Sequence, residues 1–101
     1  MTPGFTVRTT AHFDRLAKSL RKQHQEFTAR YEEGILILGE DPYNRTRRYP
    51  IKKLTDVPPG EGQYRLRLGR FRFRYDIEAQ EVILSRCGLR WEDTYRMTSC
   101  H

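Results

Sequence analysis

The feature that most constrains the fold is a run of alternating apolar and basic residues between positions 63 and 77. Alternation with a period of two indicates β-strands, because successive side chains of a strand point to opposite faces of a sheet. Gly69 and Arg70 interrupt the pattern, and glycine at the first of two turn positions fits a type II′ turn. The sequence therefore predicts a β-hairpin with a two-residue turn.

The predicted register of this hairpin places four basic side chains on one face: Arg65, Arg67, Arg72 and Arg74. Arg67 then lies opposite Arg72, and like charges that face each other on a sheet destabilise it by something under about 1 kcal/mol per pair. Acidic groups such as Asp76 or Glu61 could neutralise this face. Asp76, however, is the only acid within the two strands. We therefore favour a different interpretation, in which the arginine face binds phosphates.

The charge distribution agrees with that interpretation. The net charge is +6, and residues 45–74 hold ten Lys or Arg against two Asp or Glu, so this segment accounts for the excess. The basic residues are mostly arginine, whose planar fork suits phosphate oxygens and whose flat surface stacks on bases. A localised basic block is typical of proteins that bind nucleic acid or another polyanion. The alternative is a solvated basic face that only favours solubility.

The part of the chain before the basic block predicts a strand followed by two helices. Residues 5–9 alternate as in a short strand, and Thr9 or Thr10 can cap a helix. Apolar residues at helical spacing then predict an amphipathic helix of about three turns from Ala11. A second helical pattern covers residues 27–38. The two helices are expected to form a hairpin.

After a polar, arginine-rich stretch at residues 44–50, the sequence predicts a small sheet. A short strand is expected at 51–54, a loop rich in proline and glycine at 55–62, and a further strand at 81–87 beyond the hairpin. The expected fold is thus α+β, with the N-terminal strand and the two-helix hairpin packed on a small, mainly antiparallel twisted β-sheet. Residues 1–101 are expected to form a single domain.

Other features narrow the class of protein. No apolar stretch approaches the roughly 18 residues needed to span a bilayer, and the N-terminus lacks the apolar core of a signal peptide. We therefore expect a soluble cytoplasmic protein with reduced cysteines. Cys87, Cys100 and His101 are too few for a metal site. No cofactor or metal is implied.

The string YRLRLGRFRFRYDIEAQEVIL resembles the signature region of the RelE/ParE superfamily, the toxins of bacterial type II toxin–antitoxin systems. The stretch DRLAKSLRK, the helix exit EDPY and the closing LRWEDTYR fall in the family's order, so the resemblance covers nearly the whole chain. In the RelE-like branch it implies a ribosome-dependent messenger RNA endoribonuclease (an mRNA interferase) that inhibits translation. The implied partners are a cognate antitoxin, the A site of the 30S ribosomal subunit and messenger RNA.

The other branch of the superfamily leaves an alternative. A ParE-type toxin inhibits DNA gyrase and needs the same scaffold without nuclease activity, so gyrase is the alternative target. A homologue that has lost toxicity and only binds its antitoxin is a third hypothesis. The ending LRWEDTYR, beside the paired arginines, favours the RNA-cleaving branch.

The resemblance also implies a catalytic set, in which a 2′-hydroxyl attacks the adjacent phosphate. On matching positions the set is Arg65, Arg67, Arg72, Arg90 and Tyr95. Arginine can stabilise a developing phosphorane but cannot give up its proton, so Tyr95 is the candidate for proton transfer. Trp91 stands about where a basic residue often occurs, and it could stack on a base or seal the core.

Further residues are expected to hold RNA rather than to do chemistry. They are Arg45, Arg47, Arg48, Lys52, Lys53, Arg74 and Trp91.

Overall fold

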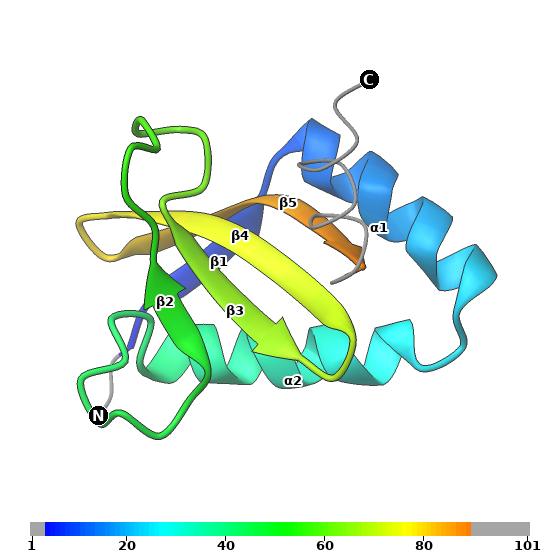
Figure 1. The fold of residues 1–101 in the computed structure, drawn as a ribbon, viewed down its shortest axis with the longest axis horizontal. Coiled ribbons are helices and arrows are strands. Elements are labelled where there is room, and N and C mark those ends of the chain that lie inside the picture. Colours follow the sequence, from blue (N-terminus) through cyan, green and yellow to red (C-terminus); the bar gives the residue numbers. More distant parts are fainter. Residues whose placement is uncertain (1–3, 90–101) are drawn as a thin grey trace.

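The computed structural model describes residues 4–89, in which a strand and two helices precede four further strands (Figure 1). In chain order the elements are β1 (Thr6–Thr9), α1 (Ala11–Gln23), α2 (Phe27–Glu40), β2 (Ile51–Lys53), β3 (Tyr64–Leu68), β4 (Phe71–Glu78) and β5 (Glu81–Leu89).

The five strands form one sheet with the order β1-β5-β4-β3-β2. β1 pairs with β5 in parallel, and every other neighbouring pair is antiparallel. The first and last described strands therefore lie side by side, with the two helices connecting β1 to the rest of the sheet. This confirms the predicted α+β class and the mainly antiparallel sheet.

Both helices bury one stripe of side chains against the same face of the sheet. α1 begins at the predicted cap, where the Thr10 hydroxyl accepts a hydrogen bond of 3.0 Å from the backbone N–H of Phe13. The buried helical residues are Phe13, Ala17, Leu20, Phe27, Gly34, Ile37 and Leu38. In Figure 1 the two helices diverge from their short connection. No helix within residues 4–89 is long and apolar enough to cross a membrane.

The β3–β4 hairpin has the predicted register, with Arg67 opposite Arg72 and Arg65 opposite Arg74. The apolar residues that alternate with these arginines face the helices. Those buried in the core are Leu66, Leu68, Phe71, Phe73 and Tyr75. Because the helices cover only this face of the hairpin, the opposite face is left to the arginines.

The hairpin turn is also the predicted one. Gly69 has a φ of +60°, whereas Arg70 is not among the residues with positive φ, as a type II′ turn requires. Arg70 Nε donates a 2.9 Å hydrogen bond to Glu26 Oε2, and its Nη2 lies 2.8 Å from His24 Nδ1. The turn is thus tied to the linker between the two helices.

A bulge in β5 changes which residues of this strand face the core. Tyr75 of β4 pairs with Leu84, but the preceding residue Arg74 pairs with Arg86, so Ser85 is the extra residue. Before the bulge Leu84 points into the core, and after it Cys87 does so. An unbulged strand would instead turn Arg86 inward, because facing alternates residue by residue. The bulge therefore places Arg86 on the same face as the hairpin arginines.

Candidate nucleic-acid interface

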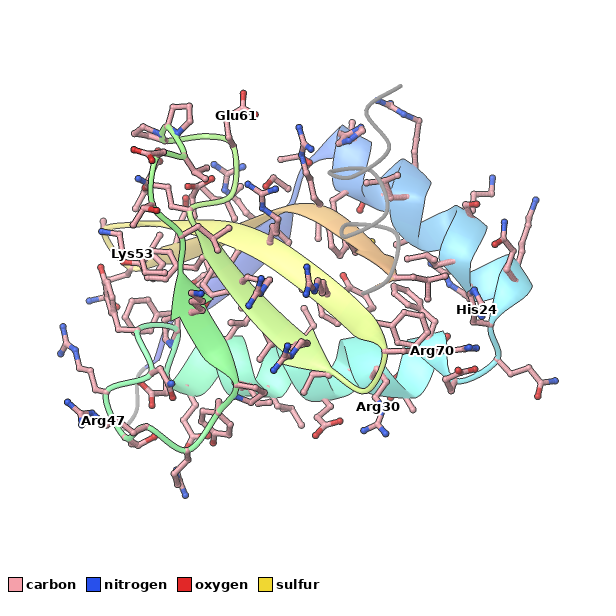
Figure 2. The ribbon with its side chains drawn as sticks, viewed as in Figure 1. His24, Arg30, Arg47, Lys53, Glu61 and Arg70 are labelled. Atoms are coloured by element: carbon pink, nitrogen blue, oxygen red, sulfur yellow. The ribbon has the colours of Figure 1, made fainter. Side chains whose placement is uncertain are left out.

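Six basic side chains of β2 to β5 share the sheet face opposite the helices, and we call this surface the basic face. It consists of Lys52, Arg65, Arg67, Arg72, Arg74 and Arg86. Figure 2 shows nitrogen-tipped side chains gathered over β3 and β4, with Glu61 in the loop that precedes β3. Every member comes from a strand, so the spacing of the charges is set by the backbone ladder.

The basic face is organised in two rows that run across the strands. In the long row Lys52 is the register partner of Arg65, Arg65 of Arg74, and Arg74 of Arg86. Neighbouring strands lie about 4.8 Å apart, so this row of four cations spans about 14 Å.

The short row lies two residues further along the strands, about 7 Å away. In it Arg67 pairs with Arg72, and Arg72 pairs with Gly88. The row ends at a residue without a side chain, so its two cations are adjacent.

The arginine stems are held by packing rather than extended into solvent. Arg65, Arg67, Arg72 and Arg74 are all partly buried, and the Nε atoms of Arg65 and Arg72 are shielded from solvent. A guanidinium whose stem is fixed loses less conformational entropy when it binds an anion. The basic face is thus a preorganised set of donors.

Two acidic groups, Asp76 and Glu61, lie near one end of the basic face. Asp76 is buried and accepts hydrogen bonds from the backbone N–H groups of Gly62 (2.9 Å) and Gln63 (3.1 Å), so its charge serves to anchor the preceding loop. Glu61 lies 3.6 Å from Arg86 Nη2. Within residues 4–89, no carboxylate forms an ion pair with Arg67. Among the described residues, ion pairing with a carboxylate therefore does not account for the charge of Arg67.

Arg74 has a structural task in addition to its charge. Its Nε donates to the carbonyl oxygen of Gly62 at 3.1 Å, and its Nη2 donates to that of Glu61 at 2.9 Å. Gly62 has a φ of +85°, and a Cβ there would lie 2.8 Å from Arg74 Cβ, so a glycine is required at this crossing. Part of the donor set of Arg74 is thus used to hold the loop over the sheet.

The predicted RNA-holding residues Arg45, Arg47 and Arg48 are exposed on the loop between α2 and β2. Asp41, which is only 7% exposed, holds this loop by accepting hydrogen bonds from the N–H of Arg45 (2.9 Å) and the hydroxyl of Thr46 (2.7 Å). Burial acts to raise the pKa of Asp41, but these hydrogen bonds and the charge of Arg48 lower it below its ordinary value. The loop is therefore a folded element anchored by a charged carboxylate.

The two lysines of β2 point to opposite faces of the sheet. Lys52 joins the long row, while Lys53 is the register partner of Tyr64 and lies over its ring at 5.6 Å from the centroid. Figure 2 shows Lys53 and Arg47 at the opposite end of the view from Arg30 and Arg70. The structure thus brings Lys52, but not Lys53, together with the hairpin arginines.

Three residues predicted for the site, Arg90, Trp91 and Tyr95, lie outside the described residues. Arg86 was not among the predicted site residues, yet it completes the long row. The signal for Arg86 in the sequence is weak, because strict alternation from Leu84 would direct its side chain into the core.

An apolar groove lies on the helical side of the molecule, between β1 and α2. Its volume is about 670 Å³, and it is lined by Gly4, Phe5, Val7, Ile35, Leu36, Gly39 and Glu40. Leu36 is 75% exposed. An exposed leucine beside an open apolar groove is typical of a surface that binds another protein.

Comparison with known proteins finds similarity in structure rather than in sequence. No family model matches the sequence, and no curated protein matches it significantly. One chain of the toxin–antitoxin complex RelBE2 from Mycobacterium tuberculosis superposes with a TM-score of 0.66 and 23% identity, covering 87% of this chain and 100% of that one. One chain of the archaeal RelE–RelB complex from Pyrococcus horikoshii OT3 gives a TM-score of 0.63 and 23% identity, covering 87% and 97%. The chain therefore has the RelE-like fold, as its resemblance to that family predicted.

Proposed function

We propose that this protein is the toxin of a type II toxin–antitoxin system and acts as an mRNA interferase, cleaving messenger RNA on the ribosome. The observation that supports this most strongly is the basic face, six cations fixed by strand register on the side of the sheet that the helices leave open. The two solved structures compared above are RelE–RelB-type toxin–antitoxin complexes, which favours the RelE branch.

The basic face suits the electrostatic part of RNA cleavage. When a 2′-hydroxyl attacks the neighbouring phosphate, negative charge builds on the phosphate oxygens in the transition state. Arg67 and Arg72 face each other in the short row, and Arg65 lies in the adjacent long row. Bidentate guanidinium groups at these positions can bind the phosphorane oxygens more tightly than the ground-state phosphate. The three arginines are therefore proposed to stabilise the transition state.

Proton transfer needs a different group, because arginine stays protonated at any useful pH. Tyr95 is proposed for this role, with Arg90 as a further cation. β5 ends at Leu89, and Gly88 is the register partner of Arg72, so the chain continues toward Arg90 and Tyr95 from the end of the short row. This connection supports the proposal that the tail completes the site.

A cognate antitoxin is the proposed protein partner. The apolar groove between β1 and α2 is the proposed binding site for an amphipathic segment, whose apolar side chains would cover Leu36. An acidic segment of the same antitoxin would suit the basic face. The proposed inhibitor is thus a chain that contacts both sides of the toxin.

Expression of the protein in a bacterial cell, followed by primer extension on cellular messenger RNA, tests the proposed activity. We expect discrete cuts within translated regions, and we expect Arg72→Ala and Tyr95→Phe to abolish them. Arg15→Ala, on the exposed side of α1, is the matched control and should cut like the unmodified protein. Absence of cuts together with inhibited DNA supercoiling would contradict the proposal and favour gyrase as the target.

A further inference from the structure

The long row contains one cation, Arg86, that has no role in the proposed function. Arg65 belongs to the proposed catalytic set, and Lys52 and Arg74 are proposed to hold RNA. Arg86 stands at the opposite end of this row from Lys52. It lies there only because the bulge at Ser85 shifts the phase of β5.

The surroundings of Arg86 indicate that it is available to an external anion. Its side chain is 44% exposed, and its ion-pair partner Glu61 is 55% exposed, with 3.6 Å between Nη2 and Oε1. An exposed ion pair of this kind contributes little stability, because water screens both charges. A phosphate could therefore replace the carboxylate at Arg86 with little loss to the fold.

The position of Glu61 is fixed independently of its carboxylate. Its backbone carbonyl accepts from Arg74 Nη2 at 2.9 Å, and its N–H donates to the carbonyl of Pro58 at 3.1 Å. The next residue, Gly62, donates its N–H to Asp76. The loop thus keeps its place when the Glu61 side chain turns away, so only that side chain has to move.

We propose that Arg86 binds a backbone phosphate of single-stranded RNA beside the reacting phosphate, and that Glu61 is the counter-ion displaced when this phosphate binds. This inference rests on the proposed RNA-cleaving function. A row of cations about 14 Å long follows a backbone across the strands, as positively charged grooves do in proteins that bind single strands. The RNA path would then run across all four strands from β2 to β5.

Fluorescence anisotropy with a labelled single-stranded RNA oligonucleotide, titrated at several salt concentrations, tests this proposal. Arg86→Gln should weaken binding several-fold and lower the slope of log K against log salt by about 0.7, the value for one lost phosphate contact to a single strand. Arg86→Lys should restore most of the slope. Arg15→Gln, the same change on the outer side of α1, should alter neither quantity.

The role of Glu61 gives a prediction of opposite sign. Glu61→Gln should strengthen RNA binding in the unmodified protein, and this gain should largely disappear in the Arg86→Gln background. Glu32→Gln, an exposed acid on α2, controls for the general effect of removing a negative charge. An equal gain from Glu61→Gln in both backgrounds would contradict the proposed displacement.

Ribosome-dependent cleavage by the same variants separates this inference from the proposed function. If the unmodified protein neither binds RNA nor cuts it on the ribosome, the proposed function fails. If it does both, and Arg86→Gln binds RNA with unchanged affinity and salt slope, only the role of Arg86 is overturned. Loss of antitoxin binding by Arg86→Gln with unchanged RNA binding would also overturn it, because the row would then serve the protein partner.

Discussion

Arg67 and Arg72 face each other across the hairpin, although a neutral or acidic residue at either position would suit the sheet better. The register that pairs them also puts their alternating neighbours, such as Leu66 and Phe73, into the core. The two arginines therefore cannot move apart without a register slip that would expose the apolar face. A bound phosphate would offset their repulsion.

The repulsion between Arg67 and Arg72 predicts that one substitution lowers activity without lowering stability. Arg67→Thr removes a like-charge contact and introduces a good strand former, so the free energy of unfolding should stay the same or rise by up to about 1 kcal/mol. Cleavage should fall about 100-fold or more, as for the loss of one transition-state donor. Urea denaturation and ribosome-dependent cleavage measure the two effects, and a parallel fall in both would refute the separation.

Burial in the core suppresses the reactivity of the Cys87 thiol. It is 8% exposed in the core, and burial raises the pKa of its thiol to about 12. The thiolate is the reactive form, so we expect Cys87 to resist alkylation at pH 8 until the protein unfolds.

The alkylation should be followed by mass spectrometry in a Cys100→Ser background, which leaves Cys87 as the single thiol. Because the folded pKa lies above the unfolded value of about 8.5, the unfolded state loses its proton first as pH rises. Stability should therefore decline above about pH 8.5. Rapid modification of the native protein at pH 8 would contradict the buried position.

At the scale of elements, the loop between α2 and β2 depends on one buried carboxylate. Asp41 accepts hydrogen bonds from Arg45 and from the backbone and hydroxyl of Thr46. Asn44 adds a reciprocal pair with the backbone of Tyr49, at 2.8 and 3.1 Å. The loop that presents three arginines is thus held by hydrogen bonds between its own polar groups.

Asp41→Asn should destabilise the protein by about 1–3 kcal/mol at neutral pH, because charged acceptors form the stronger hydrogen bonds. The folded pKa of Asp41 is lowered, so its contribution is present above the unfolded pKa of about 3.9 and is lost as pH falls through the folded value. The difference in unfolding free energy between the two proteins should therefore shrink on acidification. A difference that is independent of pH would show that the carboxylate charge is not what stabilises the loop.

The sequence was informative where local rules agree with the fold. The alternation around Gly69 predicted both the turn and the register of the hairpin, because strand facing and turn length together determine pairing. The cap was likewise predicted from residue type as Thr9 or Thr10, and the structure shows Thr10. In these elements short-range chemistry and tertiary packing favour the same structure.

Features that depend on distant partners could not be predicted in this way. The parallel pairing of β1 with β5 joins strands from the two ends of the described chain, and nothing local specifies it. The bulge at Ser85 was missed because alternation alone gives no signal for an extra residue, and with it the site residue Arg86 was missed. Lys53 was grouped with Lys52 by adjacency, although strand geometry sends neighbours to opposite faces.

At the scale of the whole molecule, the sheet separates two surfaces of different chemistry. The basic face lies on one side, and the apolar groove beside α2 lies on the helical side. The proposed RNA substrate and the apolar segment of the proposed antitoxin would therefore bind on opposite sides. It follows that substitutions can weaken one partner without affecting the other.

Leu36→Asp should weaken the antitoxin complex by tenfold or more, on the order of 1.4 kcal/mol, because it places a charge where an apolar contact is proposed. Leu36 is 75% exposed, so the fold and ribosome-dependent cleavage should be unaffected. Co-purification and isothermal titration with the cognate antitoxin measure the effect. Thr28→Asp on the same helix is the control. Equal weakening of the complex by both variants would argue against the groove as the antitoxin-binding site.

Cleavage of a defined messenger RNA by the purified protein, with and without purified ribosomes, tests the central claim most directly. We predict cuts mapped by primer extension within the translated region, only when ribosomes are present, and their loss in Arg72→Ala but not in Arg15→Ala. Intact messenger RNA in the presence of ribosomes and folded, unmodified protein would contradict the claim that the basic face serves RNA cleavage on the ribosome.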